Sequence, residues 1–294
     1  MSAPRRVLPG TTYLVTRKSA QGQFLLRPAR VVNQTFLFVL AVAARRFGIR
    51  VHLFCVLSNH FHLLLTDPKA RLPAFMQFLD SFVARAMNAL LDRREAFWAP
   101  GSYSAVALAT PEDILRKAVY VLANPVAAGL VRKGHLWPGL WSAPEAVGAE
   151  PIAVDRPRHF FDEEGELPEK ETLRLRVPPG FASAEEFRAQ LCAALEEREA
   201  ELARRLLDFL GAKKVLEQRP TDRPKRMQPR RHLNPRVAAR DKWRRIEVLG
   251  RLVEFLRSYR DAWLDWKAGK RNVVFPAGTY QLRVQHGVAC AGAG

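Results

Sequence analysis

Two short apolar runs joined by a polar turn constrain the fold of this chain more than any other feature. Residues 51–57 and 61–66 are rich in Val, Leu and Phe, and Ser58-Asn59 separates them. Runs of this length bounded by turn residues predict two buried strands. The second run opens with His60-Phe61-His62, and alternate side chains of a strand share a face, so both imidazoles are expected side by side. Such a pair can chelate a divalent metal, but His-x-His also arises by chance, so the pair alone leaves both interpretations open.

The flanking sequence alternates between strand and helix patterns. Strands are predicted at 11–17 and 103–108, with a short extra strand at 24–26, and helices at 28–47, 72–94 and from Thr110 to near Asn124-Pro125. The order β-α-β-β-α-β followed by a helix is typical of a ferredoxin-like, split βαβ fold of the α+β class. Its antiparallel sheet has helices on one face and can leave the other face open to a ligand.

The charge balance favours a polyanionic partner, most simply nucleic acid. The 294 residues carry a formal net charge of +18, with a pI near 10.6. Residues 1–148 hold 18 Lys/Arg against 7 Asp/Glu, residues 149–209 hold 9 against 15, and residues 210–294 hold 20 against 7. Two basic blocks therefore flank an acidic one.

These blocks predict the domain organisation. We expect a first domain over 1–148, an acidic Pro-rich linker over 149–181, and a mainly helical basic region over 182–294 with an Arg-rich run at 213–245. Within the last region, helical patterns cover 182–210 and 241–267, and 273–275 with 280–284 suggest a hairpin. The run at 213–240 reads as extended and partly disordered when free.

Composition also bounds the cellular setting. No apolar stretch is long enough to span a membrane, and the N-terminus lacks the apolar core of a signal peptide. The three cysteines, Cys55, Cys192 and Cys290, are widely spaced and suit a reducing compartment. We therefore expect a cytoplasmic, nucleoid-associated protein with no membrane partner.

The third predicted helix adds two candidate functional residues. Tyr120 and Asn124 are four apart and so lie on one helix face. Asn124 offers a carbonyl oxygen to a Mg²⁺ or Mn²⁺ ion, and Tyr120 is a potential nucleophile toward a substrate activated by a nearby cation. Taken singly, Tyr120 is also explained as a tyrosine at the edge of the core, and Asn124 is also explained as the last residue of a helix before Pro125. Their combination with His60 and His62 in a basic chain favours the hypothesis that Tyr120 and Asn124 are functional residues.

These motifs resemble a known family. Ser58 to Leu65 resembles the His-hydrophobic-His box of the single-tyrosine HUH transposases, and Tyr120 to Val131 resembles the tyrosine-helix signature of their REP-associated branch. Gly139-Leu140-Trp141-Ser142 matches the Trp-Ser that usually closes that domain. The resemblance covers roughly residues 8–148. Ser58 stands where Pro is common, and the loop at 93–103 matches the usual pattern loosely.

The resemblance implies a chemistry. Family members are ferredoxin-like nucleases that cut single-stranded DNA beside a hairpin, form a 5′-phosphotyrosine bond and free a 3′-OH. By position, His60, His62 and Asn124 would bind a divalent metal, Mg²⁺ or Mn²⁺, and Tyr120 would be the nucleophile. The partner would be single-stranded DNA carrying a REP-like hairpin. No nucleotide cofactor is expected, since the chain has no Gly-rich Lys-Ser/Thr loop, and the expected state is a monomer or homodimer.

Basic residues are candidates for phosphate contact, and two rival functions stay open. The DNA-binding candidates are Arg5, Arg6, Arg17, Lys18, Arg45, Arg46, Arg116, Lys117, Arg230 and Arg231. One rival is a non-catalytic protein that binds DNA hairpins on the same fold. The other is an RNA-binding ferredoxin-like domain, which would need aromatic residues where His60 and His62 stand.

Overall fold

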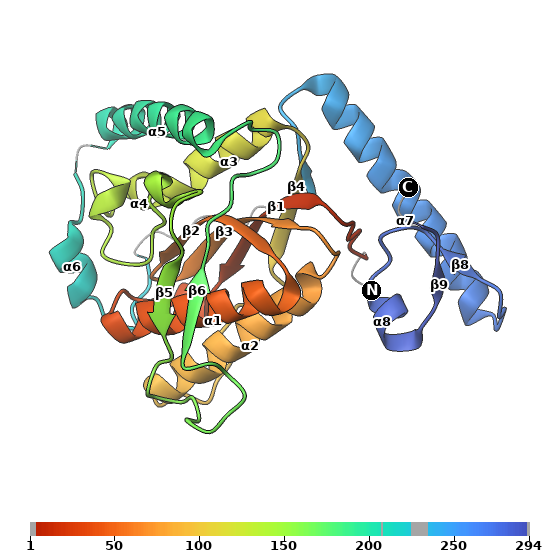
Figure 1. The fold of residues 1–294 in the computed structure, drawn as a ribbon, viewed down its shortest axis with the longest axis horizontal. Coiled ribbons are helices and arrows are strands. Elements are labelled where there is room, and N and C mark those ends of the chain that lie inside the picture. The colour runs from red at the N-terminus through yellow and green to blue at the C-terminus, as the bar shows by residue number, and fades with distance from the viewer. Residues whose placement is uncertain (1–3, 207, 225–234, 293–294) are drawn as a thin grey trace.

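The structure is a computed structural model that describes residues 4–206, 208–224 and 235–292 (Figure 1). The helices in chain order are α1 Arg30–Phe47, α2 Leu72–Leu90, α3 Pro111–Leu122, α4 Asn124–Ala127, α5 Ala184–Arg205, α6 Ala212–Glu217, α7 Lys242–Lys267 and α8 Gln281–His286. The strands are β1 Thr11–Lys18, β2 Arg50–Leu57, β3 His60–Asp67, β4 Ser104–Leu108, β5 Ile152–Asp155, β6 Lys170–Leu173, β7 Val237–Ala238, β8 Val274–Phe275 and β9 Ala289–Cys290.

The first four strands form the predicted ferredoxin-like sheet. Among the described residues the main sheet has the order β2-β3-β1-β4-β7, and β3 and β4 both pair antiparallel with β1. The β2–β3 hairpin turns at Ser58-Asn59, as its sequence predicts. The short extra strand predicted at 24–26 is wrong, because these residues lie in a turn. Their side chains are buried nevertheless, which explains the apolar pattern without a ladder partner.

The two faces of the sheet are covered by different helices (Figure 1). Phe61 on β3 is fully buried and its ring lies 5.0 Å from that of Phe36 on α1, so α1 and α2 cover the Phe61 face. His60 and His62 point to the opposite face, and α3 packs on β2 and β3 there. The sequence predicts helices on one face, and the third helix lies across the face that would otherwise be open.

The acidic segment after the first domain packs against the core. Residues 149–181, expected as a linker, contain the antiparallel β5–β6 hairpin, and Leu173 is buried. His52 fastens this segment to the sheet: its Nδ1–H donates to the Arg176 carbonyl (2.7 Å) and its Nε2 accepts from the Thr66 hydroxyl (2.7 Å). A segment rich in Pro and Glu can therefore be part of the fold when a few apolar and polar contacts hold it. The exact domain boundaries stay a prediction.

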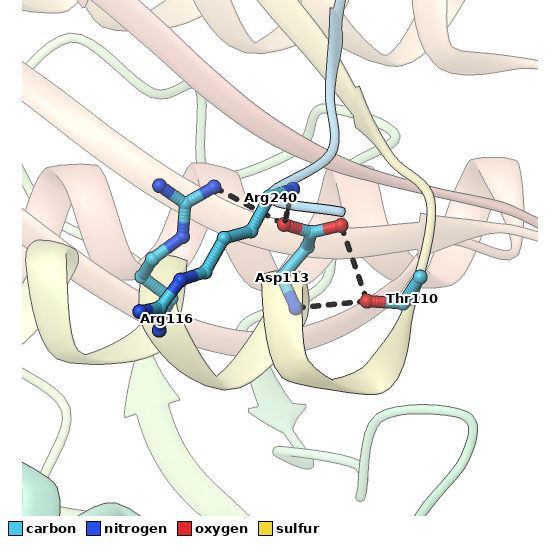
Figure 2. A network of polar contacts seen from close by, with 4 residues as sticks. All are labelled: Thr110, Asp113, Arg116 and Arg240. Carbon is cyan, nitrogen blue, oxygen red and sulfur yellow. Dashed lines mark hydrogen bonds and ion pairs between the residues drawn. The ribbon is translucent and has the colours of Figure 1, made fainter. Parts of the chain in front are cut away.

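The C-terminal region joins the core at the free edge of β4. Two residues of β7 pair parallel with β4, and the backbone N–H of Arg240 donates to Asp113 Oδ1 at the start of α3 (2.9 Å). Figure 2 shows this junction: Asp113 also accepts from Arg116 (3.1 Å) and from the Thr110 hydroxyl (3.1 Å). A buried carboxylate therefore holds the beginning of α3 and the C-terminal region together.

The rest of the C-terminal region is loosely packed. α7 spans 26 residues, of which Phe255 and Ala262 are buried. The predicted hairpin at 273–284 is wrong: β8 pairs parallel with β9, and residues 281–286 form α8. The alternating apolar pattern there covers too few residues to distinguish a strand from a helix. Residues 213–217 of the Arg-rich run are helical in α6, and its Arg230 and Arg231 lie outside the described residues.

Candidate active site

His60 and His62 lie at the start of β3, on the face that α3 covers. Their ring centroids are 4.9 Å apart, and His62 is buried while His60 is partly exposed. The tight Ser58-Asn59 turn brings both histidines into the ladder, where the i, i+2 spacing puts them on one face. The predicted side-by-side placement of the two imidazoles is therefore confirmed.

The hydrogen bonds of each imidazole fix its tautomer. Asn59 Oδ1 can only accept, so His60 Nδ1 donates to it (2.7 Å). The Asn124 side-chain amide nitrogen lies 3.1 Å from His62 Nε2 and donates to it, so His62 Nδ1 carries the proton and donates to Thr16 Oγ1 (2.8 Å). Both Nε2 atoms therefore keep a lone pair, which is the arrangement of histidines that bind metals.

The environment keeps both imidazoles neutral. Burial, together with the nearby Lys18 ammonium, lowers the pKa of His60 to about 4. Burial lowers the pKa of His62 well below its ordinary value, and His60, Lys18 and Lys117 act in the same direction. Imidazoles that are neutral at physiological pH are competent metal ligands, because no proton competes with the metal for the lone pair.

α3 and its first following residues place Tyr120 and Asn124 over the histidines. The helix begins at a sequence-encoded cap: the Thr110 hydroxyl accepts from the Asp113 N–H (3.2 Å), and Pro111 occupies the first turn. The Tyr120 ring lies 5.2 Å from the His62 ring, centroid to centroid, and the Tyr120 side chain is 46% exposed. The structure thus brings the predicted nucleophile on α3 together with the three predicted ligands, two on β3 and one at the start of α4.

The Trp-Ser motif holds these elements in register. The Trp141 indole N–H donates to the Leu122 carbonyl at the end of α3 (2.9 Å). Ser142 bonds to both backbone groups of Phe54 on β2, through its hydroxyl and its own N–H. This motif therefore ties the helix that carries Tyr120 to the strand next to His62, which gives a physical reason for its place after the tyrosine helix.

The donors fit a divalent ion. The Asn124 amide nitrogen donates to His62 Nε2 (3.1 Å), and rotation of this carboxamide would present its oxygen to an ion at the same place as a third ligand. In the described part of the chain no cluster of three or more His, Cys, Asp and Glu side chains could hold a metal, so a carboxylate does not complete the set. Water and substrate phosphate oxygens would fill the remaining positions that Mg²⁺ or Mn²⁺ requires. The metal assignment stays a prediction.

The predicted phosphate-binding cations divide into two groups. Lys117 lies 5.4 Å from the centre of the Tyr120 ring, and Lys18 is exposed beside His60, its cross-strand partner. Arg5, Arg6 and Arg17 do not reach this face: Arg5 stacks on Tyr103, Arg6 lines a cavity on the far side of the sheet, and Arg17 pairs with Asp80 at 3.2 Å.

The remaining predicted cations are peripheral. Arg116 pairs with Asp113 at 3.1 Å and is half exposed, while Arg46 covers the Phe78 ring and Arg45 pairs with Glu171 at 3.1 Å. Two residues of the site were not predicted: Asn59 and Thr16, which hold the Nδ1 atoms. Thr16 stands opposite His62 in the β1–β3 ladder, and only the strand register reveals that relation.

Comparisons with known proteins give structural matches alone. No protein-family model matches the chain, and no curated protein matches it. One similar structure is that of the REP-associated tyrosine transposase bound to a REP hairpin, with a TM-score of 0.40 and 20% identity, covering 47% of this chain and 81% of that one. Another is a protein designated a transposase from Deinococcus radiodurans R1, with a TM-score of 0.27 and 19% identity, covering 36% and 85%.

Both superpositions are partial and loose, so we infer function from the geometry of the site. Within the described ranges, none of the helices combines the length and the apolar character that crossing a bilayer requires.

Proposed function

We propose that this chain is a metal-dependent single-tyrosine enzyme that nicks and rejoins hairpin-bearing single-stranded DNA, in the manner of the REP-associated tyrosine transposases that its motifs resemble. One observation carries the proposal: Tyr120 and Asn124 both contact His62, and His60 lies beside it. A half-exposed phenol beside two neutral imidazoles whose Nε2 atoms carry no proton is suited to act as a nucleophile next to a metal site.

The chemistry exchanges one phosphodiester bond for another. Tyr120 Oη attacks the scissile phosphorus, an O–P bond to the tyrosine forms, and the bond from phosphorus to the 3′ oxygen breaks. The phenol proton passes to solvent, and the departing 3′ oxygen takes up a proton. The product is a 5′-phosphotyrosine and a free 3′-OH, and attack by a 3′-OH reverses the reaction. The bond energy is conserved, so the reaction needs no nucleotide cofactor.

Charges at the site suit this transition state. A divalent ion held by His60, His62 and Asn124 would supply Lewis-acid stabilisation of the scissile phosphate. Lys117, one turn before Tyr120, and Lys18 supply positive charge where the phosphate must lie. Thr16 and Asn59 keep both imidazoles in the ligating tautomer.

The proposed partner is a DNA hairpin with a single-stranded flank. The net charge of +18 supports a polyanionic partner, and the REP-hairpin complex among the similar structures is an example of such a partner on a related fold. We propose that the protein acts in the cytoplasm at the nucleoid, as a monomer or homodimer.

The test is formation of a covalent protein–DNA adduct. Purified protein is incubated with labelled hairpin DNA from repeats flanking its gene and with Mn²⁺ or Mg²⁺, then resolved on a denaturing gel. We expect a labelled band at protein mass that EDTA and Tyr120→Phe abolish and the matched control Tyr280→Phe retains. Tight hairpin binding without an adduct would instead support the non-catalytic binding protein. An adduct that persists in Tyr120→Phe would refute the nucleophile assignment.

A further inference from the structure

A cavity lies on the side of the sheet opposite His62, between the edge of β4 and α7. Its volume is about 160 Å³. The N-terminal segment, β1, β4, β7 and α7 all contribute to its lining. The walls are largely aliphatic, with Leu8, Leu72, Ala107 and Leu252 among them. A cavity of about 150 Å³ with apolar walls accepts one benzene ring, so this one has room for a single six-membered ring.

The polar side chains of the cavity are arginines, tyrosines and Thr11, whose hydroxyl donates to the Leu8 carbonyl (2.9 Å). Arg5, Arg6, Arg236 and Arg251 line it, and it has no acidic lining residue in the described chain. Burial and the neighbouring Arg5 both lower the pKa of Arg236, so these two guanidiniums lie close enough to repel. Arg251 pairs with Glu247 at 2.6 Å and is largely exposed, which places it at the rim. A phosphate group would relieve the repulsion between the arginines.

Two buried donors of the lining lack a hydrogen-bond acceptor. No described residue accepts a hydrogen bond from the Tyr103 hydroxyl or from Arg6 Nε, and the Arg5 guanidinium approaches the hydroxyl as a donor. Tyr103 is 8% exposed, and burial raises the pKa of its phenol to about 12 against the effect of Arg5, so the hydroxyl keeps its proton. Buried polar groups without partners are rare in folded proteins and call for an absent ligand or water. Two donors beside an apolar wall match a ring with two carbonyl acceptors.

We propose that this cavity binds one thymine nucleotide, with its ring against the aliphatic wall, its carbonyl oxygens facing Tyr103 and Arg6, and its phosphate against the arginines. The nucleotide is either a free monophosphate or an unpaired residue of a DNA strand. The strand as the source rests on the proposed function, whereas the chemistry of ring and phosphate does not. The site would thus give the protein a second contact with DNA, away from Tyr120.

Calorimetric titration of the full chain tests this inference. The probes are thymidine 5′-monophosphate, deoxycytidine 5′-monophosphate, inorganic phosphate and hexathymidylate. We expect saturable binding of the thymidine nucleotide, at least about tenfold tighter than phosphate or the cytidine nucleotide, because each charge-assisted or unmatched polar contact changes binding by about that factor. Hexathymidylate binding tighter than the monophosphate identifies the strand as the source, and equal affinity identifies the free nucleotide.

Variants locate the binding. Arg6→Gln removes a charge and a donor and should weaken thymidine nucleotide binding about tenfold, while Arg257→Gln, an exposed arginine of α7 outside the cavity, should leave it unchanged. Leu252→Trp fills the cavity and should abolish binding, with circular dichroism confirming the fold. No saturable binding, phosphate binding as tight as that of the nucleotide, or full binding in Leu252→Trp would each overturn the inference.

The two proposals fail separately. Binding is measured without strand cleavage, so a chain that forms no Tyr120 adduct still tests the cavity. Conversely, adduct formation by a protein whose cavity binds no nucleotide refutes this inference and leaves the proposed function standing.

Discussion

α3 and α7 differ in how their length is used. α3 has 12 residues, buries Ile114, Ala118, Val121 and Leu122, and leaves Tyr120 exposed above His62. α7 has 26 residues but buries Phe255 and Ala262, while Trp243, Ile246, Leu249 and Val253 are exposed. Because α3 packs one side of its length on the core, it holds the Tyr120 side chain in place relative to the sheet. α7 buries few side chains for its length, so it holds its residues less firmly.

The dense packing of α3 makes it a suitable place for a catalytic side chain. A catalytic group must stay within a fraction of an ångström of its partners, and packing on rigid elements provides that. The α7 region, with its cations and few buried side chains, suits contacts that tolerate adjustment, such as phosphates along a strand. The following experiments test this division between the two regions.

The largest effect is expected at the histidine pair. His62→Ala removes a proposed metal ligand and the contact of both Tyr120 and Asn124, so metal-dependent nicking should fall at least about a thousandfold. Ile246→Ala, on the exposed face of α7, is the control and should keep nicking within about twofold. Adduct yield with hairpin DNA measures both, and comparable losses in the two variants would show that nicking does not depend specifically on the histidine pair.

The next largest effect is expected on stability, because a truncated side chain costs more in the well-packed α3 than in α7. Leu122→Ala deletes a fully buried side chain of α3 and should lower the free energy of unfolding by about 2–5 kcal/mol. Val253→Ala removes a side chain that is 57% exposed and should change it by less than about 0.5 kcal/mol. Urea unfolding followed by circular dichroism reports both values. A large loss in Val253→Ala would show that α7 is packed in solution.

The free energy of unfolding should depend on pH through His52, which bonds the acidic segment to the sheet. Burial lowers the pKa of His52 to about 4, so the folded chain binds fewer protons there than the unfolded chain, whose histidine titrates near 6.5. Stability should therefore fall as pH drops from about 6.5 to about 4, by about 2–3 kcal/mol from this residue. His52→Gln should flatten that fall, as urea unfolding at several pH values would show. An identical pH profile in the variant would rule out His52 as the cause.

The junction between the two regions should show the smallest effect. Asp113→Asn weakens the carboxylate bonds to Arg116, Arg240 and Thr110 shown in Figure 2, at an expected cost of about 1–2 kcal/mol. Limited proteolysis should then release the α7 region faster than in the control Asp261→Asn, an exposed carboxylate of α7. Equal release rates would show that the Asp113 bonds do not hold the junction.

Local patterns determined much of this protein. The apolar runs around Ser58-Asn59 predicted a hairpin, and the period of two put both imidazoles on one face, because strand geometry fixes side-chain direction. The Thr110-Pro111 start predicted α3, because a cap is a short-range interaction. The ferredoxin-like order followed from the succession of strand and helix patterns.

Long-range packing decided the rest. Thr16 meets His62, and Arg176 meets His52, only through the register of strands and the docking of a distant segment. The acidic segment could not be separated from a linker, because burial of a few residues such as Leu173 outweighs its polar composition. The cavity beside Tyr103 likewise forms only where the N-terminal segment, β1, α2, β4, β7 and α7 meet. Sequence sets what each stretch can form, whereas contacts between stretches far apart in the chain depend on the sum of the packing, and no single motif encodes that sum.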